Sequence, residues 1–111
     1  MDAMEPVYHL VLPVLWNDPA QADYRAASLD SEGFIHCSYA GQVEASANRF
    51  YAGAERLLLL CIDPGRLSSP LKVEPAGSGQ MFPHIYGPIN RDAVTGVREM
   101  RRDGGTWVFP S

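Results

Sequence analysis

The chain is poor in cysteine and in basic residues, and it has no long apolar run. Its two cysteines, Cys37 and Cys61, are far apart and form no C-x-x-C motif, which excludes a zinc ribbon or a thioredoxin-type site. Nine Lys and Arg residues against 13 Asp and Glu give a net charge of -4 and no concentrated basic surface, which disfavours a nucleic-acid partner. Without a visible signal peptide or membrane span, we expect a cytoplasmic protein with free thiols and no membrane partner.

What is present suffices for one folded domain. With 111 residues, of which 46% are hydrophobic, we expect a single domain over residues 1–111 with its core at about 7–109. The pattern predicts an α+β fold with about six or seven short strands and two helices. The oligomeric state stays open.

Short apolar or alternating runs predict the strands. They fall at residues 7–12, 34–38, 57–62, 71–74 and 82–86, and a final hairpin is predicted to pair 93–100 with 106–109. A short helix is predicted to begin with Asp18 as N-cap and Pro19 in its first turn, and residues 28–33 are predicted to be a polar loop. The clearest helix is predicted over 40–52, with an apolar stripe of Val43, Ala47, Phe50 and Tyr51.

All three histidines lie in predicted strands, and His36 is the first candidate site residue. Period-two alternation places His36 and Ser38 on one strand face, together with Phe34, and an imidazole there can donate from one nitrogen and accept at the other. The side chains of His36 and Ser38 could therefore line a cleft. Two alternatives stay open, namely a neutral core imidazole for His36 and a helix N-cap for Ser38.

The second candidate segment is the late strand at residues 82–86. Alternation places Phe82, His84 and Tyr86 on one face, which makes a plausible cradle for a flat heterocycle or a ribose. The alternative is an aromatic cluster that packs against the opposite sheet, with His84 at its rim.

Three further residues have plainer interpretations beside the functional ones. His9 has apolar neighbours on its own face, which is typical of a core histidine, and Glu74 shares a face with Lys72, which is typical of a solvated strand. Cys37 lies on the face opposite His36, so a thiolate–imidazole pair is not expected. The histidines lack the i, i+4 spacing of a helical metal motif, so no metal is predicted.

Taken together, the motifs resemble domain-of-unknown-function family 952 over nearly the whole chain, from Val7 to about Phe109. The residues that carry the resemblance are Tyr8-His9-Leu10, Trp16, Tyr24, Ser28-Leu29, Glu32-Gly33-Phe34-Ile35-His36-Cys37-Ser38, Gln42, Glu74 and Phe82-Pro83-His84-Ile85-Tyr86-Gly87-Pro88. The family has no established activity. Its fold is similar to that of ADP-ribosyltransferases, a split pair of sheets with a nicotinamide-dinucleotide cleft between them.

The resemblance implies roles for particular residues. His9 would contact the cofactor ribose from the first strand, the second-strand segment would offer His36 and Ser38, and Tyr39 lies just beyond. A polar residue from a late strand, which orients the reaction at the nicotinamide ribose, would be either Glu74 or His84. A carboxylate there would stabilise the oxocarbenium-like centre of ADP-ribosyl transfer by its charge.

Two main hypotheses follow. The first is an NAD-utilising, ADP-ribosyltransferase-like enzyme that uses His9, His36, Glu74 and His84, and stacks nicotinamide on Tyr86 or Tyr39. The second is a non-catalytic module that binds a nucleotide or another small metabolite. Glu74 beside the histidines would favour the enzyme, and Glu74 in solvent would favour the binder. A third hypothesis, a metal-dependent hydrolase built on three histidines, has no support from spacing.

Overall fold

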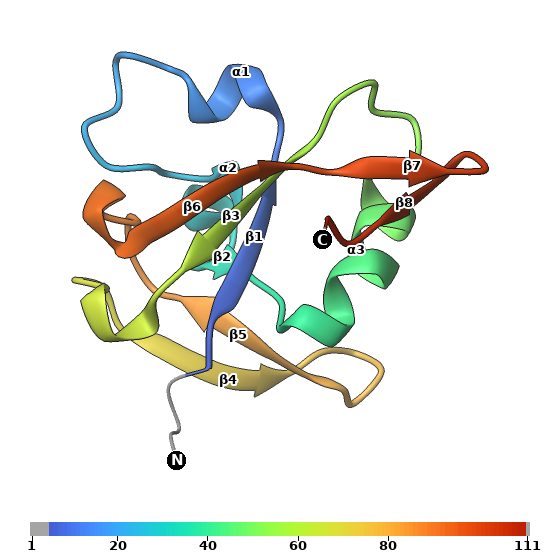
Figure 1. The fold of residues 1–111 in the computed structure, drawn as a ribbon. Helices are drawn as coiled ribbons and strands as arrows, with labels where there is room; N and C mark the ends of the chain where they lie inside the picture. The colour runs from blue at the N-terminus through green and yellow to red at the C-terminus, as the bar shows by residue number, and fades with distance from the viewer. Residues whose placement is uncertain (1–4, 111) are drawn as a thin grey trace.

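The computed structural model describes residues 5–110, which form two three-stranded sheets and a two-stranded hairpin (Figure 1). The strands are β1 (Val7–Val11), β2 (Ile35–His36), β3 (Leu58–Ile62), β4 (Leu71–Pro75), β5 (Met81–Ile85), β6 (Val94–Glu99), β7 (Arg101–Asp103) and β8 (Thr106–Val108). The helices are α1 (Pro13–Trp16), α2 (Ala27–Ser31) and α3 (Val43–Phe50), with 3-10 turns η1 (Ala40–Gln42), η2 (Pro64–Arg66) and η3 (Arg91–Ala93). The predicted α+β class is confirmed, with more strands and helices than expected.

The first sheet has the order β1-β3-β6 and is antiparallel throughout. Its central strand β3 is the apolar run LLLCI, which is covered on both faces. On β1, Val7 and Val11 point toward the second sheet, whereas Leu10 points toward α3 and the β7–β8 hairpin. The predicted strands at 7–12 and 57–62 and their alternation are therefore confirmed.

The second sheet has the order β2-β5-β4. Pro83 of β5 limits the length over which the edge strand β2 can pair with it. The amide of Cys37 donates to the carbonyl of Pro83 at 3.1 Å, but Pro83 has no N–H to return the second hydrogen bond of this pair. The ladder between β2 and β5 therefore spans only the pairs Ile35 with Ile85 and His36 with His84.

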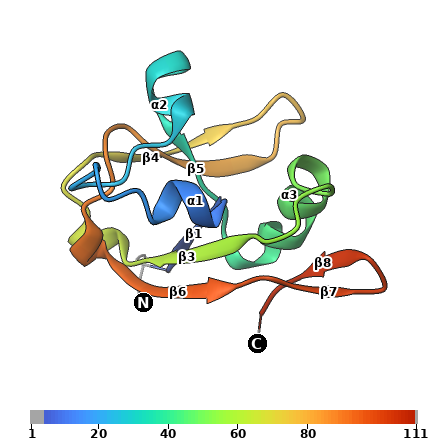
Figure 2. The same cartoon turned by 90° about the horizontal axis from the view of Figure 1, so that it is seen from above.

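The core lies between the two sheets, which Figure 2 shows as two layers seen edge-on. Ile35, Cys37 and Ile85 from the second sheet pack against Leu60 and Ile62 of β3. A second apolar cluster lies on the far side of the first sheet, where α3 and the β7–β8 hairpin cover it. The inner face of the second sheet is thus apolar, and its outer face carries the polar residues.

The first helical region differs from the prediction. A helix beginning at Asp18 is wrong, because α1 begins earlier, with Pro13 in its first turn, and Asp18 Oδ1 instead accepts the amide of Ala20 in a turn at 2.9 Å. The predicted polar loop at 28–33 is also wrong in part, since α2 occupies Ala27–Ser31.

The long helix is confirmed in position but not in its details. Ser38 is not its N-cap, because the chain turns first through η1, where Gln42 Oε1 accepts the amide of Tyr39 at 2.9 Å. Val43 and Ala47 are buried as predicted, whereas Phe50 is 68% exposed, contrary to the predicted apolar stripe. Phe50 is the last residue of the helix, and its side chain lies outside the apolar face formed by Val43 and Ala47.

The C-terminal hairpin is also shorter than predicted. β6 pairs with β3 and completes the first sheet, and only β7 pairs with β8. Gly104 and Gly105 form the turn with φ of 62° and 86°, a conformation that glycine adopts without steric cost. Within residues 5–110, none of the helices has the length and apolar character needed to cross a membrane.

Candidate functional site

Polar and aromatic side chains gather on the outer face of the β2-β5-β4 sheet, at the strand and flanking positions that alternation assigns to it. We call this surface the histidine face; its members are Phe34, His36, Lys72, Glu74, Phe82, His84 and Tyr86. Antiparallel register places His84 opposite both His36 on β2 and Lys72 on β4, and places Glu74 opposite Phe82. The sheet thus brings together two histidines that are 48 positions apart in the sequence.

His36 and His84 form a close cross-strand pair. Because Cys37 and Pro83 are the hydrogen-bonded neighbours, His36 and His84 occupy a position without ladder hydrogen bonds, where side chains come closest. Their ring centroids lie 5.4 Å apart, with the ring planes at 77°. Two imidazoles can therefore act on one small ligand at this point of the sheet.

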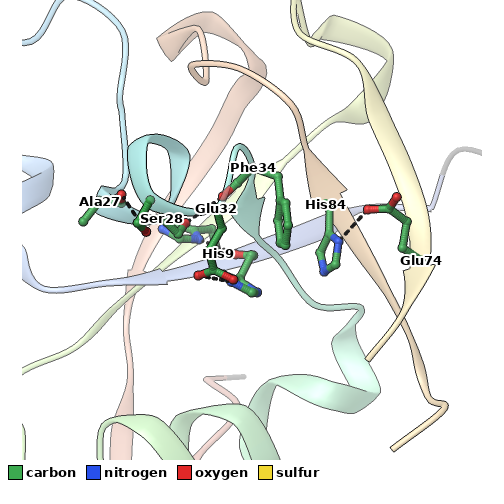
Figure 3. A network of polar contacts seen from close by, with 9 residues as sticks. His9, Ala27, Ser28, Glu32, Phe34, Glu74 and His84 are labelled. Atoms are coloured by element: carbon green, nitrogen blue, oxygen red, sulfur yellow. Dashed lines mark hydrogen bonds and ion pairs between the residues drawn. The ribbon is translucent and has the colours of Figure 1, made fainter. Parts of the chain in front are cut away.

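Glu74 holds His84 in one tautomer. Its Oε1 lies 2.8 Å from His84 Nδ1 (Figure 3). The same oxygen also accepts the hydroxyl of Tyr86 at 2.5 Å. The hydrogen bonds from Tyr86 and His84 lower the pKa of Glu74, so the carboxylate is ionised and His84 Nδ1 carries the proton. In neutral His84, Nε2 is then an acceptor, and it has no hydrogen-bond partner among residues 5–110.

Phe34 covers His84 on the histidine face, as Figure 3 shows. The two rings stack with centroids 4.0 Å apart and planes at 18°, and the side chain of His84 is only 10% exposed. Glu74 is 34% exposed, so solvent reaches the carboxylate side of the pair. A carboxylate–imidazole pair that is shielded on one side and open on the other is suited to proton transfer.

His36 belongs to a second carboxylate–imidazole pair, and this pair is open to solvent. His36 Nε2 lies 3.0 Å from Glu32 Oε2, and the two side chains are 55% and 50% exposed. Such an exposed pair contributes little to stability. His36 is therefore not a core histidine, and its ring is accessible to a ligand.

His9 lies apart from the histidine face, in the core. Its Nδ1 donates to the backbone carbonyl of His36 at 2.6 Å, and its Nε2 accepts the hydroxyl of Tyr24 at 3.0 Å. Burial lowers the pKa of His9 from 6.5 to about 4, so the ring is neutral near pH 7. Both ring nitrogens are engaged within the protein, as the core interpretation of this histidine predicts.

The structure does not bring Ser38 and Tyr39 onto the histidine face. Ser38 is buried, its hydroxyl lies 3.4 Å from that of Ser46, and its backbone pairs with Tyr8 of β1. Tyr39 packs partly buried against the core between the sheets. Cys37 is buried on the inner face, and burial raises the pKa of its thiol.

Three residues of the site were absent from the predicted set. Phe34 and Lys72 could have been found by alternation, since Phe34 shares a face with His36 and Lys72 shares one with Glu74. Lys72 Nζ lies 4.8 Å from the ring centre of Tyr86 and supplies the positive charge of the face. Glu32 follows α2, outside any strand, so periodicity could not place it beside His36.

Two surface hollows, each of about 300 Å³, lie away from the histidine face. One is lined by Trp16, Arg91 and the 17–21 loop, and the other by residues around Asp63. Arg91 uses its guanidinium to bind the backbone carbonyls of Trp16, Gln21 and Ala22, which fixes that loop. Within residues 5–110, no group of three or more His, Cys, Asp or Glu side chains is placed to hold a metal ion.

Comparison with solved structures identifies close structural relatives. The chain is similar to the crystal structure of protein CC0527 from Caulobacter crescentus, with 28% identity, a TM-score of 0.83 and coverage of 93% of each chain. It is also similar to the solution NMR structure of CC0527, with 28% identity, a TM-score of 0.78 and coverage of 92% of this chain and 90% of that one. No curated protein matches the chain. The model of the family described as "Protein of unknown function (DUF952)" matches residues 14–97, and the chain therefore belongs to this family.

Proposed function

We propose that the histidine face is the active site of a small NAD-utilising, ADP-ribosyltransferase-like enzyme. The observation that carries the proposal is the position of Glu74, whose carboxylate lies beside His84 and Tyr86 and on the face that also carries His36. An ionised carboxylate that accepts from a shielded imidazole, on a face that also exposes a second imidazole, is the arrangement expected of an enzyme rather than of a solvated strand.

The face offers the contacts that NAD requires as a substrate. Phe82 and Tyr86 present aromatic rings on which nicotinamide or adenine can stack. Lys72 supplies a cation beside Tyr86 for the pyrophosphate, and exposed His36 is placed to hydrogen-bond a ribose hydroxyl. These residues fit a flat, anionic dinucleotide that lies across the three strands.

The chemistry assigned to the site is transfer at the nicotinamide ribose. The bond between the ribose carbon and the nicotinamide nitrogen breaks, nicotinamide leaves with the electron pair, and an acceptor oxygen, from water or a hydroxyl group, bonds to that carbon. His84 Nε2 takes the proton of the acceptor, and Glu74 stabilises the resulting imidazolium through Nδ1. The same carboxylate stabilises the positive charge that develops at the ribose carbon.

The proposal includes the finer fold assignment, in which the two stacked sheets are a small relative of the ADP-ribosyltransferase pair of sheets. This protein differs from the ADP-ribosyltransferase pattern in the place of the binding surface. The space between the sheets is filled by apolar side chains such as Ile35, Leu60 and Ile85, so the proposed binding surface is the outer face of the second sheet. A reducing cytoplasmic setting, with Cys37 and Cys61 free, belongs to the same proposal.

A non-catalytic module that binds a nucleotide or another small metabolite is the second candidate. One observation favours it: a single oxygen of Glu74 accepts hydrogen bonds from both His84 and Tyr86. A carboxylate engaged in this way can serve to shape a binding surface. The same face and the same ligand contacts would then be used without turnover.

A thermal-shift titration with NAD, ADP-ribose and nicotinamide tests the binding step. The wild type is compared with His36→Ala, which removes an exposed ring and should leave the unliganded melting temperature nearly unchanged. A saturable rise with NAD that His36→Ala loses supports the face as the site. Chromatographic detection of released nicotinamide then separates enzyme from binder, and no shift with any of the three compounds would reject NAD.

A further inference from the structure

We infer that His9 is a positioning residue for His36, acting through the backbone carbonyl of His36 rather than by touching a ligand. The inference starts from the orientation of that carbonyl. Because Cys37 pairs with Pro83 through a ladder hydrogen bond, the polar backbone groups of His36 point away from β5, toward the open edge of the sheet.

At that edge, the carbonyl of His36 needs a donor, and His9 supplies it. His9 Nδ1 lies 2.6 Å from the oxygen, and the side chain of His9 is buried between the sheets. A carbonyl can only accept, so Nδ1 carries the proton and Nε2 must be the acceptor. The hydroxyl of Tyr24, 3.0 Å from Nε2, donates to it and so holds the same tautomer.

This contact matters because β2 is held weakly by its own ladder. The strand has two residues, Ile35 and His36, and β5 pairs with it on one side only. Tyr8 of β1 pairs with Ser38, two residues further along, through two backbone hydrogen bonds of 2.8 Å. His9 is the residue of β1 that bonds His36 itself, whose ring stands opposite His84. Shifting the backbone at His36 would move its imidazole relative to His84 and Phe34, whose ring centroids lie 5.4 and 4.8 Å away.

Two substitutions that introduce side chains of similar shape test the inference. His9→Asn keeps an N–H donor at the position of Nδ1, whereas His9→Leu has the same branching and no donor. NMR of the full chain with labelled histidine and phenylalanine measures the cross-relaxation between the His36 ring and the rings of His84 and Phe34. We expect His9→Asn to keep these signals and His9→Leu to lose them. Folded His9→Leu with unchanged signals, or folded His9→Asn without them, would overturn the inference.

Tyr24→Phe provides a second measurement, which separates the bond from His9 to the His36 carbonyl from the other hydrogen bond of His9. If His9→Leu does not fold, the ring contacts in folded His9→Asn still test the inference. Tyr24→Phe removes the hydroxyl at Nε2 and leaves the bond from Nδ1 to the His36 carbonyl in place. We expect the ring contacts of His36 to persist in Tyr24→Phe, and their loss in folded protein would contradict a role carried by Nδ1.

The functional consequence rests on the proposed function. Nicotinamide release from NAD should fall in His9→Leu by on the order of 10- to 100-fold, because small displacements of a reacting group have effects of that size, and His9→Asn should restore much of it. If the wild type neither binds nor cleaves NAD, the proposed function fails, while the ring contacts of His36 still decide the role of His9.

Discussion

His36 and His84 lie directly opposite each other across the β2–β5 ladder, with ring centroids 5.4 Å apart. Each imidazole forms a hydrogen bond with its own carboxylate, His36 with Glu32 and His84 with Glu74. The two pairs differ in environment, since His84 is covered by Phe34 whereas His36 is exposed. Two imidazoles with separate partners and different exposure can take different roles on one ligand.

Glu74→Gln tests the charge of the carboxylate. The amide oxygen can still accept from His84 Nδ1, but it no longer stabilises an imidazolium or a cationic ribose carbon. We expect nicotinamide release to fall on the order of 10²- to 10⁴-fold, measured as kcat/KM for NAD. Glu99→Gln is the matched control, because Glu99 is also a paired carboxylate, bonded to Arg56, but lies on β6 of the other sheet. Equal activity in both variants would remove Glu74 from the mechanism.

Tyr86 is expected to provide stacking surface. Tyr86→Ala should weaken NAD binding by roughly 1–3 kcal/mol, the range found for bases stacked on aromatic side chains. Tyr86→Phe keeps the ring and loses only the hydroxyl that donates to Glu74, so it should retain most of the affinity. Isothermal titration calorimetry of the three proteins measures the difference, and unchanged affinity in Tyr86→Ala would place the ligand elsewhere.

The stability of the protein should depend on pH through His9. Its pKa is lowered from 6.5 to about 4 in the folded state, so between these values the unfolded chain binds the extra proton. The stabilisation from neutral His9 is present above pH 6.5 and is lost as the pH falls toward 4, by about 3 kcal/mol in total.

Urea unfolding at several pH values between 4 and 7 measures this loss. The control is His9→Asn, which cannot titrate in this range. The difference in free energy of unfolding between wild type and variant should shrink as the pH falls from 7 to 4. A difference that stays constant with pH would show that His9 does not carry the dependence.

Cys37→Ser should leave any activity of the histidine face intact. The thiol is buried on the inner side of the sheet, and burial raises its pKa, so it is not a thiolate at neutral pH. The buried hydroxyl should lower the free energy of unfolding by roughly 1–3 kcal/mol. Loss of nicotinamide release in folded Cys37→Ser would instead indicate a thiol mechanism.

The space between the sheets should behave as a packed core. Leu60 is fully buried there, so Leu60→Ala should lower the free energy of unfolding by about 2–5 kcal/mol in denaturant titration. The control is Leu15 on α1, which is 53% exposed. Leu15→Ala should change the free energy of unfolding by no more than roughly 0.5 kcal/mol. Similar costs for both would contradict a core between the sheets.

The sequence by itself determined the α+β class, the strands around His9, His36 and His84, and the side of each strand on which these histidines lie. These features depend on local chemistry: apolar alternation has a period of two, and a buried central strand reads as a continuous apolar run. The competition between two possible helix starts was harder to judge from the sequence. Pro13 and Asp18 both carry helix-start signals, and only packing selected the helix at Pro13.

Only the tertiary structure decided which histidines meet. Sequence alternation gives a face for each strand but no strand order, and the order β2-β5-β4 places Glu74 and His36 on either side of His84. His9 has the same local pattern as the other two, yet its strand belongs to the other sheet, with its ring directed into the core. Pairing between strands is a long-range choice set by burial of the whole core, and no short segment of the sequence contains it.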